Sequence, residues 1–193
     1  APASRTGRWE TGLPFIHIFF VGPVQPALAD GKGSVQIPGS LVYTGMERWR
    51  KKMAVPTRCL ISLPDSISYE IGAILTDAVS TPYHAVVRRA QLQKGESVAI
   101  FGCGGLGSQA IKFCKMFEAG TIIAVDTNEK ALERAKILGA THTVLVSDQP
   151  ANKQIRSLTE GAGVDVAFEF VGLPQTIDTA VRSLRRGGRA VIA

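Results

Sequence analysis

The pattern of apolar and polar residues is most regular in the second half of the chain. From residue 97 onward, short apolar runs alternate with longer stretches of helical spacing. The runs predict strands at 97–101, 121–125, 142–146, 164–170 and 189–193, and the stretches between them predict helices at 105–118, 128–138, 151–160 and 174–185. Strands that alternate with helices in this way form a parallel sheet with helices on both faces. The fold class is therefore α/β, a doubly wound parallel sheet of the Rossmann type.

Glycine and proline set the expected ends of several helices. Gly139 is expected to close the second helix of the series, and Gly187-Gly188 the last one. An apolar stretch before the first strand, Tyr69–Ala90, also has helical spacing but contains Pro82. Because proline disfavours helical geometry in the residue before it, we expect a break at Thr81 and a second helix from Tyr83.

The first 52 residues have a different pattern of apolar and polar positions. Residues 1–52 show no clear period and are rich in proline and glycine, which predicts an irregular N-terminal segment. Residues 53–193 are predicted to form the nucleotide-binding domain described below. The chain stops inside its last predicted strand, whereas this fold usually has six strands, so we expect a domain truncated before the sixth strand.

A glycine loop joins the first strand of the series to its helix. Its sequence is Gly102-Cys103-Gly104-Gly105-Leu106-Gly107. In a dinucleotide fingerprint, Gly102 permits the tight turn, Gly104 lets the backbone approach a pyrophosphate, and Gly107 lets the helix pack closely on the strand. The N-terminus of the helix then offers free N–H groups to the phosphates. The loop and its strand–helix context therefore predict a dinucleotide site.

Asp126 is an acidic residue at the end of the next strand, 19 residues after Gly107. A carboxylate at this place accepts hydrogen bonds from the adenosine ribose of NAD and repels the 2′-phosphate of NADP. We therefore predict NAD as the cofactor and consider NADP less favoured. The alternative, in which Asp126 caps the helix at 128–138, is compatible with that role.

Charge and cysteine content limit the kinds of partner and the cellular compartment that we expect. The net charge is +6, of which residues 1–60 carry +5, so the domain after them is nearly neutral and no nucleic-acid partner is predicted. Three cysteines without paired spacing indicate a reducing compartment, so we expect a cytoplasmic protein. The apolar run Leu13–Val21 resembles a signal peptide, but Glu10 and Pro14 argue against it, and no run is long enough to span a membrane.

The cysteines and histidines have less specific roles. Cys103 and Cys114 are expected to pack against the sheet as small core residues. His17 and His142 have no partner at metal-ligand spacing, and neither is predicted to bind a metal. His84, on the helix after Pro82, is expected to be solvated or capped rather than catalytic.

Several segments together resemble the cofactor domain of zinc-dependent medium-chain alcohol dehydrogenases, including the sorbitol and threonine dehydrogenase relatives. They are Leu63-Pro64-Asp65, Asp77–Ala85, Lys94-Gly95-Glu96, the glycine loop, Ala135–Ala140 and Glu169-Phe170-Val171-Gly172, and they follow one another in order and at family spacing. The resemblance covers about three quarters of the chain and does not specify a substrate.

The resemblance implies an NAD-dependent oxidoreductase that transfers a hydride between a small alcohol or carbonyl substrate and NAD. It implies that Thr81 faces the nicotinamide ring, that Leu106 packs behind this ring, and that Gly105 and Val171 also lie at the cofactor. It places Asp77 where the family has one ligand of its catalytic zinc, which would act as a Lewis acid on the alcohol oxygen. A purely structural role for Asp77 in its helix is the alternative.

The sequence also departs from the family. The family's other catalytic zinc ligands, a Cys and the His of a Gly-His-Glu segment, belong to an N-terminal catalytic domain, and residues 1–52 contain neither. Residues 1–52 are therefore either unrelated to that domain or a remnant of it. Two other hypotheses stay open: a zinc-free, NADPH-dependent reductase of the same superfamily, and a non-catalytic nucleotide-binding module whose free sheet edge pairs with another copy.

Overall fold

The computed structural model describes residues 19–21, 34–36, 52–54, 60–146 and 149–193. The chain divides into two compact units, Ala1–Thr76 and Asp77–Ala193. The division predicted from sequence, at residues 52 and 53, stays a prediction. In the described part of the chain, no helix is long and apolar enough to cross a membrane.

The described part of the first unit consists of short strands and one helix. Strand β1 (Phe19–Val21) pairs in parallel with β4 (Leu60–Ser62), and β2 (Ser34–Gln36) pairs antiparallel with β3 (Lys52–Ala54). Helix α1 (Tyr69–Ile74) starts after Ser68, whose hydroxyl accepts a hydrogen bond from the Ile71 N–H. Most of residues 1–52, with His17 and the signal-like run up to Ile18, and also Cys59, lie outside the described residues.

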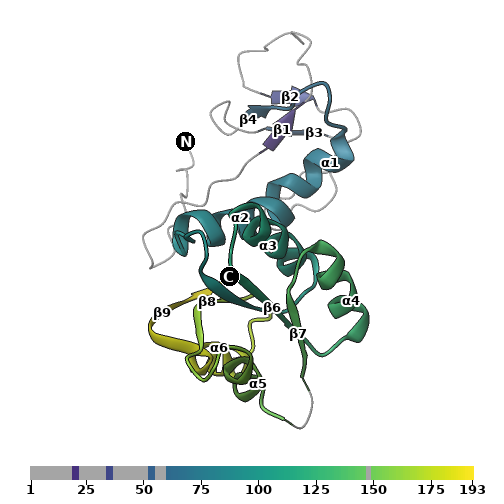
Figure 1. The fold of residues 1–193 in the computed structure, drawn as a ribbon. Coiled ribbons are helices and arrows are strands. Elements are labelled where there is room, and N and C mark those ends of the chain that lie inside the picture. Colours follow the sequence, from purple (N-terminus) through teal and green to yellow (C-terminus); the bar gives the residue numbers. More distant parts are fainter. Residues whose placement is uncertain (1–18, 22–33, 37–51, 55–59, 147–148) are drawn as a thin grey trace, which may run out of the picture. The chain divides into compact units, whose positions relative to one another are not determined.

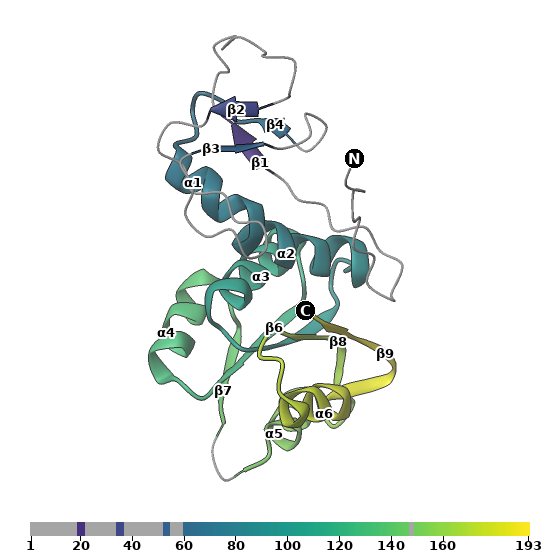
Figure 2. The same cartoon turned by 180° about the vertical axis from the view of Figure 1, so that it is seen from behind.

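The second unit is built on a five-stranded parallel sheet with the order β7-β6-β5-β8-β9. The strands are β5 (Ser97–Phe101), β6 (Thr121–Asp126), β7 (His142–Leu145), β8 (Val164–Glu169) and β9 (Leu184–Ile192). The helices between them are α3 (Gly105–Met116), α4 (Glu129–Leu138), α5 (Ala151–Leu158) and α6 (Pro174–Arg182). Figures 1 and 2 show α3 and α4 on one face of the sheet and α5 and α6 on the other, which confirms the predicted α/β fold.

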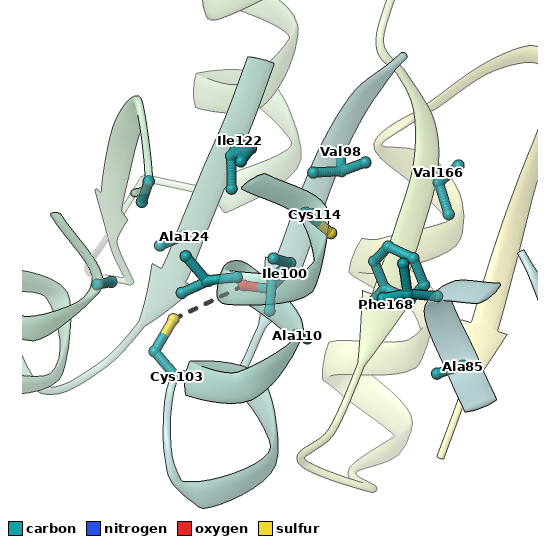
Figure 3. Packing of buried hydrophobic residues seen from close by; sticks show 14 of the residues in the cluster. Ala85, Val98, Ile100, Cys103, Ala110, Cys114, Ile122, Ala124, Val166 and Phe168 are labelled. Atoms are coloured by element: carbon teal, nitrogen blue, oxygen red, sulfur yellow. Dashed lines mark hydrogen bonds between the residues drawn. The ribbon is translucent and has the colours of Figure 1, made fainter. Parts of the chain in front are cut away.

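Alternating residues of the central strand build two cores. Val98 and Ile100 of β5 face the α3 side, where they pack with Phe168, Ile111 and Cys114 in one buried cluster (Figure 3). Ala99 and Phe101 of the same strand belong to a second cluster on the opposite face, together with Ile155 of α5 and Ala180 of α6. Each large apolar side chain buried in this way stabilises the fold by about 1.5–3 kcal/mol. A strand covered on both faces explains the continuous apolar run seen in the sequence.

The break expected at Thr81 is wrong. Helix α2 (Ser80–Tyr83) contains Pro82, and the helical turn η3 (His84–Arg89) follows at once. Wider π-helical turns flank α2 on both sides. The turn η2 (Leu75–Val79) precedes it, and in η3, which follows it, the Ala90 N–H donates to the Ala85 carbonyl five residues back. A proline lacks the N–H that an α-helical turn uses, and the widened turns accommodate this without ending the helix.

The predicted end of the last helix is also wrong. Helix α6 ends at Arg182, and Gly187-Gly188 lie inside β9 instead of closing the helix. The pairing of β8 with β9 shifts register between Val164 and Val166, which is where the extra residues of β9 are accommodated. A Cβ on Gly188 would lie 3.0 Å from the Asp165 carbonyl oxygen, so the glycine allows close pairing here.

An ion pair holds β9 to the turn before β5. The Arg189 guanidinium donates to both carboxylate oxygens of Glu96, at 2.9 and 2.5 Å, and its Nε donates to the Ala90 carbonyl at 2.5 Å. The carboxylate of Glu96 is largely buried, at 16% side-chain exposure. The hydrogen bond from Arg189 lowers the pKa of Glu96 below its usual value of 4.5. The pKa of the nearby Asp165 is also lowered. Burial alone would raise this pKa, but hydrogen bonds from Ser97 and Arg185 outweigh the effect of burial.

These two carboxylates predict a loss of stability in acid. A carboxyl group whose pKa is lower in the folded state stabilises that state above the unfolded pKa, and this contribution disappears as the pH falls toward the folded pKa. The midpoint of urea unfolding should therefore fall as the pH drops below about 4.5. Glu96→Gln should cost about 2 kcal/mol at pH 7, because Arg189 loses its counter-charge, and should flatten the acid dependence. Glu133→Gln on the exposed face of α4 serves as the control and should change neither quantity.

Candidate dinucleotide site

The glycine loop lies between β5 and α3, as the sequence predicts. Gly102 has φ +84°, a conformation that disfavours every residue with a Cβ. Gly107 is buried, and a Cβ there would lie 1.8 Å from the Gly102 carbonyl oxygen, so this position has no space for any other residue. The two glycines therefore fix a tight turn and bring the first turn of α3 directly against the end of β5.

The middle of the loop is open. Gly104 and Gly105 are exposed, and a Cβ on either of them would meet no atom within 4 Å. The Gly104 residue precedes the first turn of α3 and provides no side-chain cap. The N–H groups of the first helical turn have no partner inside their own helix and carry partial positive charge, which suits a phosphate group. The open backbone and the helix N-terminus together fit a pyrophosphate.

Asp126 lies at the end of β6 with its carboxylate beside the loop. One oxygen accepts a hydrogen bond from the Cys103 N–H at 2.7 Å, and the other accepts from the Asn128 N–H at 2.9 Å. The N-cap of α4 is Asn128, whose side chain accepts from the Lys130 N–H, so the alternative role of Asp126 as this cap does not hold. A carboxylate oxygen can accept more than one hydrogen bond, and Asp126 therefore still has acceptor capacity for a ribose hydroxyl.

Val171 lies beside the glycine loop, just after the neighbouring strand β8. It follows β8, is half-exposed, and has its Cγ2 2.7 Å from the place that a Cβ on Gly102 would occupy. β5 and β8 are adjacent, while β6 lies on the other side of β5. The chain leaves β5 toward β6 and leaves β8 toward β9, so the connections after these two neighbouring strands run in opposite directions. Open α/β sheets bind ligands at such a point, at the carboxyl ends of their strands.

Glu169 is not among the site residues predicted from the sequence. It is the last residue of β8, is fully buried, and accepts hydrogen bonds from the backbone of Val171 and Gly172. A carboxylate directly before the Phe-Val-Gly segment, at the end of an apolar strand, was the signal that could have pointed to it.

The two described cysteines are core residues, as predicted. Cys103 and Cys114 are 1% and 0% exposed, and the Cys103 thiol lies 3.9 Å from the Ile100 carbonyl oxygen (Figure 3). Burial raises the pKa of each thiol to about 12. Because the thiolate is the reactive form, neither side chain is an available nucleophile near pH 7.

Asp77 and Thr81 are close to each other. The Thr81 hydroxyl donates to the Asp77 carboxylate at 2.9 Å across one helical turn. Among the described residues, no group of three or more His, Cys, Asp or Glu side chains could hold a metal ion. A zinc ion usually takes at least three protein ligands, so the described residues do not by themselves form a zinc site. The predicted roles of Asp77 in zinc binding and of Thr81 at the nicotinamide stay predictions.

The sheet order, the glycine loop and Asp126 define an α/β domain of the dinucleotide-binding type. Residues 105–193 match the family model of zinc-binding dehydrogenases. This part of the chain is a cofactor domain of the zinc-dependent medium-chain alcohol dehydrogenase family, as the sequence resemblance implied.

Individual relatives agree with this assignment. Sorbitol dehydrogenase of Bacillus subtilis is 42% identical over 130 residues, which are 67% of this chain and 36% of that protein. The NADP-dependent isopropanol dehydrogenase of Thermoanaerobacter brockii is 36% identical over 129 residues, again 67% of this chain and 36% of that protein. The crystal structure of the alcohol dehydrogenase of Aeropyrum pernix superposes with a TM-score of 0.67 at 41% identity, and covers 74% of this chain and 42% of that one. The matched part of the chain thus spans between 36% and 42% of the length of these relatives.

Proposed function

We propose that this chain supplies the cofactor site of an oxidoreductase that transfers a hydride between a small alcohol or carbonyl compound and NAD. The observation that carries the proposal is the Asp126 carboxylate, which lies beside an open glycine loop at the carboxyl edge of a parallel sheet. The membership of the dehydrogenase family and the names of the relatives support the reaction class.

In this proposal each part of the site has one task. The backbone at Gly104 and Gly105, with the first turn of α3, holds the pyrophosphate, and Asp126 binds the adenosine ribose. The bound nicotinamide supplies the hydride chemistry itself. Leu106 packs behind the nicotinamide ring, and Val171, two residues after β8, contacts the ring. Thr81 faces the ring, and its hydroxyl is oriented by Asp77 at 2.9 Å.

NAD rather than NADP is the proposed cofactor, although one relative carries the name of an NADP-dependent enzyme. A 2′-phosphate placed beside Asp126 would bring two negative charges close together, whereas a 2′-hydroxyl donates a hydrogen bond to the same carboxylate. The residues that follow, Thr127 and Asn128, include no arginine that could pair with such a phosphate. Zinc is not part of the proposed site, because among the described residues no group of three or more His, Cys, Asp or Glu side chains could hold a metal ion.

Calorimetric titration of the full chain with NADH tests this proposal. We expect saturable binding of one NADH and weaker binding of NADPH. Gly104→Ala should reduce the affinity for NADH about tenfold or more, because its Cβ would enter the space proposed for the pyrophosphate. Its unfolding free energy should change little, since that Cβ meets no protein atom within 4 Å.

The outcomes separate the competing hypotheses. Absence of NADH binding by the folded chain would refute the proposal. A preference for NADPH would favour the zinc-free reductase of the same superfamily. A Gly104→Ala variant that binds NADH as well as the wild type would show that the cofactor does not lie on the open part of the loop.

A further inference from the structure

Glu169 is a buried carboxylate at the carboxyl end of β8. Its side chain is completely buried, and none of the ion pairs formed by the described residues includes it. Its Oε1 accepts from the Val171 N–H at 2.8 Å, the Gly172 N–H at 3.1 Å and the Thr176 hydroxyl at 2.8 Å, and its Oε2 accepts from Gly172 at 3.1 Å. A buried charge needs such donors, so these hydrogen bonds compensate its desolvation.

The donors that Glu169 holds define the conformation of one short segment. Val171 and Gly172 directly follow β8, and Thr176 lies in the first turn of α6. Gly172 has φ +78°, so the backbone turns sharply at this point. The carboxylate therefore ties the end of β8, the turn and the start of α6 together from the inside of the fold, while Val171 remains 44% exposed.

The segment after β8 lies on the side of the sheet where we expect the nicotinamide half of the dinucleotide. Asp126, the proposed ligand of the adenosine ribose, lies at the end of β6 on one side of β5, and Val171 lies at the end of β8 on the other side. A dinucleotide crosses the carboxyl edge of the sheet at the point where the strand order reverses. The nicotinamide half then reaches the β8 side.

We propose that Glu169 is a positioning residue, which fixes Val171 and Gly172 in the place where they contact the nicotinamide half of the cofactor. This inference rests on the function proposed above. It distinguishes the two sides of the site: Glu169 affects the contacts of the nicotinamide half, whereas the adenosine and the phosphates depend on Asp126 and the glycine loop.

The test compares NADH with ADP, which lacks the nicotinamide half, by calorimetry on the full chain. Glu169→Gln replaces one acceptor oxygen by an NH₂ donor. It also removes the negative charge that accepts the hydrogen bonds from Val171, Gly172 and Thr176. The affinity for NADH should fall about tenfold, while the affinity for ADP should stay within about twofold of the wild type. Thr176→Val removes one of the four hydrogen bonds at nearly constant volume and should shift the ratio of the two affinities in the same direction, by about threefold.

Glu96→Gln is the matched control. Glu96 is a largely buried carboxylate at the opposite end of the sheet, so its loss should lower stability without changing the ratio of NADH to ADP affinity. If the wild type binds neither ligand, the proposed function itself fails. If the wild type binds both and Glu169→Gln weakens them equally, Glu169 has a structural role only and the inference is overturned. If Glu169→Gln does not fold, an unchanged affinity ratio in Thr176→Val overturns it.

Discussion

Gly107→Ala should destabilise the domain by at least about 3 kcal/mol, because a Cβ at this position would have to displace backbone. The atom that it would meet, at 1.8 Å, is the Gly102 carbonyl oxygen, and Gly102 is itself held in a left-handed conformation. The first turn of α3 must then move away from β5, and the proposed phosphate site moves with it. Chemical denaturation followed by circular dichroism measures the loss, and NADH titration measures the effect on the site.

Gly105→Ala is the control for this prediction. It adds the same methyl group two residues earlier, where nothing lies within 4 Å, so its free energy of unfolding should remain within about 0.5 kcal/mol of the wild type. Equal stabilities of the two variants would contradict the close packing of α3 on the loop.

Asp126→Asn should reverse or strongly reduce the preference of the chain for NADH over NADPH. The asparagine keeps an acceptor oxygen near the loop but has no negative charge, so the hydrogen bond to the ribose weakens and the repulsion of a 2′-phosphate disappears. We expect the ratio of NADH to NADPH affinity to fall by about tenfold to a hundredfold, which corresponds to about 1.4–2.7 kcal/mol. Parallel titrations with the two reduced cofactors give this ratio directly.

Glu129→Gln provides the matched control for Asp126→Asn. It removes one negative charge from the exposed first turn of α4, three residues away. Its ratio of NADH to NADPH affinity should change much less than that of Asp126→Asn. An equal change in both variants would mean that the net charge of this edge, and not a direct contact with Asp126, sets the preference.

The sequence predicted the parts of the fold that depend on local pattern. The five strands of the described sheet and the helices α3 to α6 lie where apolar runs and helical stripes predict them, except at the junction of α6 and β9. Burial on both faces leaves a continuous apolar run such as Ser97–Phe101. The glycine loop was equally readable, since Gly102 and Gly107 serve the turn and the close packing within one local segment.

The errors concern residues whose role depends on tertiary context. Pro82 ends a helix by local rules, but π-helical turns on both sides of α2 accommodate it. Two consecutive glycines, Gly187 and Gly188, are typical of a helix end, but here they belong to a strand that pairs with β8. Glu169 reads as the polar end of a strand, and its importance becomes visible only when the N–H groups that surround it are known.

The sheet order has a consequence for how the domain opens. β5 is hydrogen-bonded to β6 on one side and to β8 on the other, whereas β7 and β9 each have one neighbour in this sheet. Fraying of an edge strand exposes only its own amides, while solvent reaches those of β5 only after the sheet separates into two halves. Amide hydrogens of β5 therefore exchange through global unfolding, and the glycine loop extends from the segment of the sheet that opens last.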